Sequence, residues 1–350
     1  MIENIRQLTV SVLMSVYNGE KYLKEAIESI LNQTFQEFEF LIIDDCSTDD
    51  TWEILTNYAI LDNRIRLLRN TNNIGLTRSL NRGLQTVQGE FIARQDADDV
   101  SLPDRLKMQL SRFALDKDLV LLGSAYFVSN ASGNIICTER QPLDDTTIRW
   151  QMLFHNCFAH SSVMLRKEIL DTYGLVYNEQ HEFAQDYGLW SRLLCFGKGA
   201  NLSKPLIKYR SHENNIGEIN SVRQQEIATE IACNNLADIG IYVDTKALSV
   251  LREWYTLQTI KLNDNFIELL HLICQIMDRF GQMEFVDKSI FKVIQRVWMI
   301  RILATLSFSR FIKYDYFIII MRALLFDPLH LVSKLLSFPA SILLHKHEPQ

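Results

Sequence analysis

The segment FEFLIIDDCSTDDTWEIL, residues 38–55, passes directly from a run of apolar β-formers into a helical pattern. Residues 38–44 have the continuous apolar character of a strand that is buried on both faces of a sheet. Two aspartates follow, and then Ser47 and Asp50 stand three residues apart, as in a capping box at the start of a helix. A strand that leads through carboxylates into a helix is the repeating unit of an α/β fold.

The same unit recurs on both sides of this segment. Short apolar runs predict strands at residues 8–16, 38–44, 64–69, 90–95 and 119–127. Helical patterns lie between them, at residues 21–34, 47–55, 75–84 and 102–113. This alternation predicts a mainly parallel sheet with helices on both faces, and such sheets bind ligands at the carboxyl ends of their strands.

The order changes after residue 130. We expect a hairpin turn at residues 132–136, a helix at 144–154, a strand at 158–166 and a helix at 184–196. From about residue 220 the pattern is almost entirely helical, with few Gly or Pro residues to interrupt it. The prediction is therefore an α/β domain over residues 1–218 and a helical region over residues 219–350.

Composition excludes several classes of protein. The 350 residues are 47% hydrophobic and 22% charged, which is typical of a folded protein. A formal net charge of −6 gives no reason to expect a nucleic-acid partner. The six cysteines are far apart without a C-x-x-C pair, and the first residues are unlike a signal peptide, so a reducing cytosol fits best.

The tail from Arg301 onward is apolar and net positive. Its charges interrupt every uncharged run well before the length of about 20 residues that a membrane span needs. One interpretation is a helix that lies on an anionic membrane surface. The other is a helical subdomain that packs on the main domain, or on a second copy of the chain in a homo-oligomer.

Carboxylates gather where two predicted strands end. Asp96 and Asp98 alternate along the chain and so can face one point, as a Mg²⁺ or Mn²⁺ site for a diphosphate requires. Asp44 and Asp45 end another strand, where a carboxylate could accept a hydrogen bond from a nucleobase or a ribose. Further along, Asp104 and Arg105 are expected to start a helix and to form a local ion pair.

Six segments give the chain a resemblance to a known family. They are residues 11–35, 38–51, 73–84, 89–106, 160–168 and 184–193, with DDCSTDD, QDADD and AQDYGLW as their most distinctive parts. In order and spacing they resemble family 2 glycosyltransferases, which are inverting enzymes with the Rossmann-like, A-type glycosyltransferase fold. The resemblance covers roughly residues 8–212.

The resemblance implies roles for individual residues. Tyr17 and Asp45 would contact the base of the nucleotide, with Asp44 serving the same pocket and Arg78 the nucleotide region. Asp96 would lie near the ribose and the metal, and Asp98 would be the principal ligand of Mn²⁺ or Mg²⁺. His212, in YRSHENN, would contact the metal or the phosphates. His160, in AHSSVMLR, would lie on the acceptor side of the cleft, where a purely structural histidine is an equal alternative.

Asp186 is the expected catalytic base. It matches an acidic pair that precedes a helix in the family, although Gln185 replaces the usual first acid. The missing charge would lower the pKa of Asp186 slightly, because a neighbouring carboxylate raises it. Read without the other segments, Asp186 would simply be a helix N-cap.

The resemblance implies transfer of a sugar from a nucleotide sugar to a glycan or lipid-linked acceptor, in the cytoplasm or at the inner face of the cell membrane. A UDP-sugar is the expected donor. A sugar nucleotidyltransferase is the alternative enzyme, but it normally has a Gly-rich basic loop where this chain has SVYNGEKY, residues 15–22. A non-catalytic nucleotide-sugar-binding module is the third interpretation. Spacing does not identify the sugar or the linkage, because side chains scattered over the cleft select them.

Overall fold

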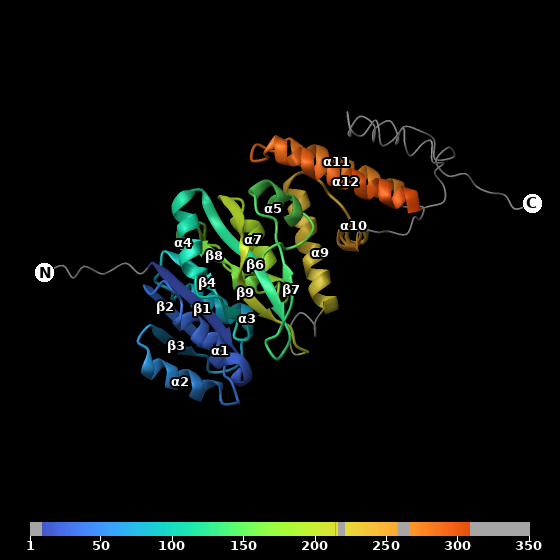
Figure 1. Ribbon diagram of the computed structural model, residues 1–350. Coiled ribbons are helices and arrows are strands. Elements are labelled where there is room, and N and C mark those ends of the chain that lie inside the picture. Colours follow the sequence, from blue (N-terminus) through green and yellow to red (C-terminus); the bar gives the residue numbers. More distant parts are fainter. Residues whose placement is uncertain (1–8, 214, 216–220, 258–265, 309–350) are drawn as a thin grey trace, which may run out of the picture. The chain divides into compact units, whose positions relative to one another are not determined.

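A computed structural model of the chain describes residues 9–213, 215, 221–257 and 266–308 (Figure 1). Its contacts form two compact units. The first comprises Met1–Arg149 and Asn156–Ala228, and the second comprises Trp150–His155 and Thr229–Gln350. The second unit therefore takes in a short segment from within the region 1–218 in addition to the helical residues after it.

The described part of the first unit contains a nine-stranded sheet in the order β3-β2-β1-β4-β8-β6-β9-β5, with β7 beside β6 (Figure 1). The five strands and the hairpin that the sequence predicted are confirmed. The strands are β1 (Val10–Val16), β2 (Phe38–Asp44), β3 (Ile65–Arg69), β4 (Phe91–Arg94), β5 (Val100–Ser101), β6 (Leu119–Ser129), β7 (Ile135–Glu139), β8 (Met164–Arg166) and β9 (Lys198–Arg210).

The sheet is mixed in direction. Strands β3, β2, β1 and β4 are parallel to one another, as expected, and β6 is parallel to β9. Strand β8 lies antiparallel between β4 and β6. The strand predicted at residues 158–166 is divided, because a 3₁₀ turn, η1 (His160–Ser162), occupies its first half. In this turn the main-chain amide and the hydroxyl of Ser162 both donate to the carbonyl of Ala159. The amide therefore does not pair with a neighbouring strand.

Helices cover both faces of the sheet. Val10, Val12, Met14 and Val16 of β1 pack in one buried cluster with α1 (Glu20–Leu31) and α4 (Arg105–Leu115). Leu13 points to the opposite face, where a Cβ on Gly83 of α3 (Leu76–Leu84) would lie 2.4 Å from its Cδ1. Glycine thus allows α3 to approach the sheet closely. This unit also contains α2 (Thr51–Leu61), α6 (Lys167–Tyr173), α7 (Gln185–Leu193) and the first part of α5 (Asp145–Met152).

Two local predictions need correction. The capping box is wrong, because α2 begins at Thr51 with Asp50 at the N-cap, and the Ser47 hydroxyl accepts the Asn18 amide at 3.0 Å instead. The ion pair between Asp104 and Arg105 is also wrong, although Asp104 does start α4. The guanidinium of Arg105 is fully buried and donates to main-chain carbonyls, since the first turn of α4 faces the sheet.

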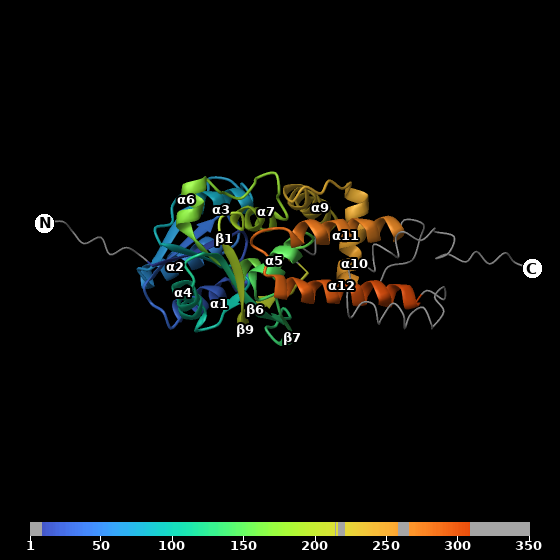
Figure 2. The same cartoon turned by 90° about the horizontal axis from the view of Figure 1, so that it is seen from above.

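The second unit is helical in its described part. It contains α10 (Thr245–Leu257), α11 (Phe266–Gly281), α12 (Lys288–Phe308) and most of α9 (Ser221–Asp238), with α11 and α12 side by side (Figure 2). Buried Arg252 donates to the carbonyl of Phe154 at 2.7 Å and so ties the segment Trp150–His155 to α10. None of the described helices combines the length and apolarity needed to cross a membrane. Most of the tail discussed above lies outside the described residues.

Candidate active site

Three loops meet at one edge of the first unit's sheet. Strands β1, β2 and β4 are parallel, with Val16 opposite Asp44 and Leu13 opposite Arg94, so their carboxyl ends lie at the same edge. The loops that leave these ends carry Tyr17, Asp45 and the segment 96–98. The structure therefore brings together the acidic segments that are far apart in the sequence.

Asp96 is held in place by two neighbours. The buried guanidinium of Arg94 lies 2.5 Å from its Oδ1, and the hydroxyl of Ser161 donates to its Oδ2 at 2.6 Å. Burial raises the pKa of Asp96, but the positive charge of Arg94 and the hydrogen bond from Ser161 more than compensate, so its pKa lies below the ordinary value. Asp96 is therefore an oriented carboxylate that stays ionised.

Asp98 and His212 meet across the fold. The Nε2 of His212 lies 3.0 Å from the Oδ2 of Asp98, and the imidazole stacks on the ring of Tyr22 with centroids 5.1 Å apart. Burial and the negative charge of Asp96 raise the pKa of Asp98, which His212 partly offsets. The two expected ligands are therefore neighbours, because β9 ends beside the loop that follows β4.

Asp98 and His212 are a chemically suitable but incomplete donor set for Mn²⁺ or Mg²⁺. An oxygen and an imidazole nitrogen both bind Mn²⁺, while Mg²⁺ prefers oxygen. Within the described ranges no cluster of three or more His, Cys, Asp or Glu side chains is arranged to hold a metal ion. The residues therefore fit a cation that takes its remaining ligands from a substrate diphosphate and water, as Mg²⁺ commonly does.

Asp99 has a structural role in this network. It is buried, and its Oδ1 accepts the amide of Arg210 at 2.9 Å. The Ser161 hydroxyl contacts the Oδ2 atoms of both Asp96 and Asp99 and so bridges the two carboxyl groups. Burial and the charges of Asp98 and Asp96 raise the pKa of Asp99 well above its usual range. Asp99 thus helps to fix the position of Ser161, which donates to Asp96.

Asp186 lies in the first turn of α7, one residue after its start. Ala184, not Asp186, occupies the N-cap, so the interpretation of Asp186 as a simple cap is wrong. Its Oδ2 accepts the Asn156 amide at 2.8 Å, and its Oδ1 accepts the main-chain amide of Tyr187 at 2.8 Å. Burial raises the pKa of Asp186 to about 6, and the negative charge of Asp96 contributes in the same direction. The result is a half-buried carboxylate with the basicity of a histidine.

The three residues expected to contact the nucleobase differ in their surroundings. Asp45 is buried and accepts hydrogen bonds from Asn70 and from the amides of Ile74 and Gly75, at 2.7 to 2.9 Å. Asp44 has no exposed surface and forms an ion pair with Arg69 at 2.9 Å. These surroundings indicate a structural role for Asp44. Tyr17 is half exposed at the end of β1. Asp45 thus fixes the loop that leads into α3, beside an available aromatic ring.

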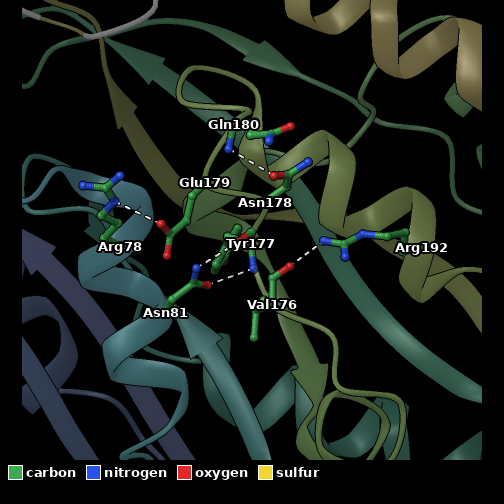
Figure 3. A pocket seen from close by; sticks show the side chains of 8 residues that line it. All are labelled: Arg78, Asn81, Val176, Tyr177, Asn178, Glu179, Gln180 and Arg192. Carbon is green, nitrogen blue, oxygen red and sulfur yellow. Dashed lines mark hydrogen bonds and ion pairs between the residues drawn. The ribbon is translucent and has the colours of Figure 1, made fainter.

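Arg78 and His160 flank the segment before α7. Arg78, on α3, forms an ion pair of 3.0 Å with Glu179 at the rim of a pocket (Figure 3). The Nε2 of His160 lies 3.0 Å from the hydroxyl of the buried Tyr177. Burial and the charge of Arg94 lower the pKa of His160 to about 3, so the imidazole is neutral at physiological pH. His160 therefore acts here as a satisfied structural histidine.

Known glycosyltransferases resemble this chain in sequence. A family model described as glycosyl transferase family 2 matches residues 11–174. An uncharacterised glycosyltransferase of Haemophilus influenzae is 30% identical over 283 residues, which cover 77% of this chain and 87% of that protein. The chain belongs to glycosyltransferase family 2. The O-antigen biosynthesis glycosyltransferase WbnJ of Escherichia coli is 38% identical over 211 residues, covering 58% of this glycosyltransferase and 80% of the relative.

Solved structures show the same fold. The crystal structure of S. aureus TarS 1-349 in complex with UDP-GlcNAc superimposes on this glycosyltransferase with a TM-score of 0.54 and 17% identity. The match covers 85% of this chain and 87% of that one. The A-type glycosyltransferase fold with a helical C-terminal region, predicted from the sequence, is thereby confirmed.

Sequence reasoning missed two residues of this glycosyltransferase site. Ser161 joins Asp96 to Asp99, and Asn156 holds Asp186, yet neither belongs to a distinctive local pattern. For Ser161 the available signal was its place beside His160 in a short polar group before a strand. The sequence contains no comparable signal for Asn156, since a single asparagine in a loop is common.

Proposed function

We propose that this chain transfers a sugar from a nucleotide-sugar donor to a hydroxyl group of a glycan or lipid-linked acceptor, with inversion at the anomeric carbon. The observation that carries the proposal is Asp186, a half-buried carboxylate whose pKa is raised to about 6. A base of that strength is ionised at neutral pH and still accepts a proton well from an attacking hydroxyl. Inversion follows from attack opposite the leaving diphosphate, which requires one catalytic carboxylate.

The donor would bind at the edge where β1, β2 and β4 end. Tyr17 offers a ring for the base, and Asp45 orders the adjoining loop. Asp98 and His212 would hold Mn²⁺ or Mg²⁺ with Asp96 beside them, and the cation would neutralise charge that develops on the departing diphosphate. UDP is the first nucleotide to test, since a solved structure of the same fold contains UDP-GlcNAc.

The acceptor is proposed to be a growing cell-surface polysaccharide. The O-antigen biosynthesis relative from Escherichia coli supports this class of product. We further propose that the protein works in the cytoplasm and attaches to the inner face of the cell membrane through its C-terminal helices. The basic and apolar exposed side chains of α12 support that placement.

Replacing Asp186 by Asn tests the catalytic role. Asn keeps the shape of the side chain but cannot take a proton, so transfer should fall by at least about 100-fold. Binding of UDP, measured by calorimetry, should stay nearly unchanged. Asp171→Asn is the matched control, because Asp171 is exposed on α6 and should leave transfer intact. Normal turnover by Asp186→Asn would refute the assignment.

Replacing Asp98 by Ala tests the metal site. Mn²⁺ should tighten UDP binding to the unmodified protein, because a cation between two anionic groups reduces their repulsion. In Asp98→Ala this tightening should disappear, whereas Asp104→Ala at the start of α4 should retain it. An unchanged effect of Mn²⁺ in Asp98→Ala would place the metal elsewhere.

A further inference from the structure

The pocket beside Arg78 lies in the first unit, and its lining contains none of the acidic loops. Its volume is about 520 Å³, and it is open to solvent. Arg78 and Asn81 of α3 form one side, the segment 176–180 forms another, and Arg192 of α7 forms the third (Figure 3). Asp96, Asp98, Asp186 and His212 do not line it. The pocket is therefore distinct from the proposed metal and catalytic groups.

Three residues of α3 and α7 hold the segment 176–180, which forms one wall of this pocket. The Asn81 amide group donates to the carbonyl of Tyr177 at 2.9 Å and accepts its main-chain amide at 2.8 Å. Arg192 donates to the carbonyl of Val176, and Arg78 pairs with Glu179. These contacts reach across from two helices, so the segment is held in shape before any ligand arrives. Such preorganisation lowers the entropic cost of binding.

The same segment connects the pocket to the active site. The side chain of Tyr177 is 2% exposed, and its hydroxyl lies 3.0 Å from the imidazole of His160. His160 precedes Ser161, which holds Asp96. A few residues further along, the chain enters α7 and reaches Asp186. The segment that lines the pocket is thus linked through Tyr177 and His160 to the neighbour of Ser161, and along the chain to Asp186.

The chemistry of the lining selects a class of ligand. Arg78 and Arg192 offer planar donors, Glu179 offers an acceptor, and Gln180 offers both kinds of group. Glu179 already neutralises Arg78, so the pocket lacks the concentrated positive charge that a diphosphate would favour. Sugar hydroxyls are donors and acceptors at once, and they match a mixed lining of this kind.

We propose that this pocket binds a sugar residue of the acceptor glycan, beyond the residue that receives the transferred sugar. The proposal deepens the proposed function and rests on it, because an acceptor chain must extend away from Asp186. Glu179 and Gln180 would contact the sugar hydroxyls, while Asn81 holds the wall in position. The pocket would then select acceptors by the sugar that lies behind their growing end.

Saturation-transfer NMR with four free sugars tests the proposal. The probes are glucose, galactose, N-acetylglucosamine and glucuronic acid at millimolar concentration, added to the full chain with UDP and Mn²⁺. We expect a signal from at least one sugar, and a loss of affinity of about tenfold in Glu179→Ala and in Gln180→Ala, the cost of one strong hydrogen bond. Glu226→Ala is the matched control, because Glu226 is equally exposed and ion-paired with Arg223 at 2.8 Å.

UDP binding to the same samples separates this proposal from the proposed function. If the unmodified protein binds no UDP, the UDP-linked donor of the proposed function is refuted. That result is independent of whether the sugars bind to the pocket. If UDP binds normally but no sugar gives a signal, or if both pocket variants keep the signal, the pocket is not a saccharide site. Weaker UDP binding in folded Glu179→Ala would overturn the proposal too, because the pocket would then serve the nucleotide.

Discussion

Asp186 owes its basicity to its surroundings rather than to its chemistry. Burial raises its pKa to about 6, while the hydrogen bonds from Tyr187 and Asn156 lower it and so limit the rise. An ordinary aspartate would be a much weaker base, with a pKa near 3.8. The elevated value is what makes a single carboxylate sufficient for the proposed mechanism.

The pH dependence of transfer should report this pKa. The base works in its ionised form, so kcat/KM should fall about tenfold for each pH unit below the pKa and level off above it. We expect the bend near pH 6, measured with saturating metal at each pH. A bend near pH 4 would show that Asp186 has an ordinary pKa or is not the base.

Asn156→Ala should move that bend to higher pH. The Asn156 amide donates to the ionised carboxylate and favours it, so its removal raises the pKa of Asp186. On the alkaline plateau the variant should retain most of its activity. Equal loss at every pH, with the bend unmoved, would show that Asn156 only supports the local fold. Asn134→Ala, in the β6–β7 turn, is a control that should leave the profile unchanged.

How well the sequence predicts the site depends on the kind of contact. Asp98 and His212 were identified because each stands in a distinctive motif, although their contact at 3.0 Å joins residues far apart in the chain. Ser161 and Asn156 were missed because their roles come from tertiary hydrogen bonds alone. The raised pKa of Asp99 depends on burial among other charges, which no local pattern contains.

At the scale of elements, continuous apolar runs were a reliable guide to strands. Strands β1, β2, β3, β4 and β6 lie where they were expected, and β1, β2 and β4 are buried along their whole length. The insertion of β8 between β4 and β6 was not predictable, since a strand of three residues carries little pattern and its direction depends on the preceding turn. Strand order in a mixed sheet is a property of the whole path of the chain.

Arg105 links several of these elements and should be essential for stability. Its buried guanidinium donates to the carbonyls of Arg94 and Val163 and to the hydroxyl of Ser101, joining α4 to the sheet. In Arg105→Leu these acceptors lose their partner, so we expect a loss of about 3 kcal/mol or more. The melting temperature of the purified protein should fall by several degrees.

Arg112→Leu on the same helix is the matched control for this prediction. Arg112 is partly exposed and pairs with Asp116 at 3.4 Å, one turn away. Such a pair contributes at most about 0.5 kcal/mol, so the melting temperature should hardly change. Equal shifts for the two variants would mean that the network around Arg105 is not what stabilises this region.

At the scale of the whole molecule, the question is what the helical region contacts. The described part of α12 exposes Lys292, Val293, Arg296, Val297 and Ile300, at helical spacing. No acidic residue occurs in α12, although the whole chain carries a net charge of −6. Basic and apolar side chains on one face suit an anionic lipid surface. This face adds to the net positive tail that the sequence places after it.

Liposome flotation of the full chain tests the membrane attachment. We expect the protein to float with vesicles that contain phosphatidylglycerol and to remain below with pure phosphatidylcholine, since attraction to anionic headgroups supplies much of the binding. Lys292→Glu/Arg296→Glu should weaken binding by at least about thirtyfold, given about 1 kcal/mol for each basic residue near the surface. Lys107→Glu/Lys117→Glu changes the net charge equally on exposed residues of the first unit and should float normally. If both double variants bind the vesicles equally weakly, the net charge of the protein and not this face of α12 causes the binding. If neither variant changes flotation, residues outside α12 attach the protein to the membrane.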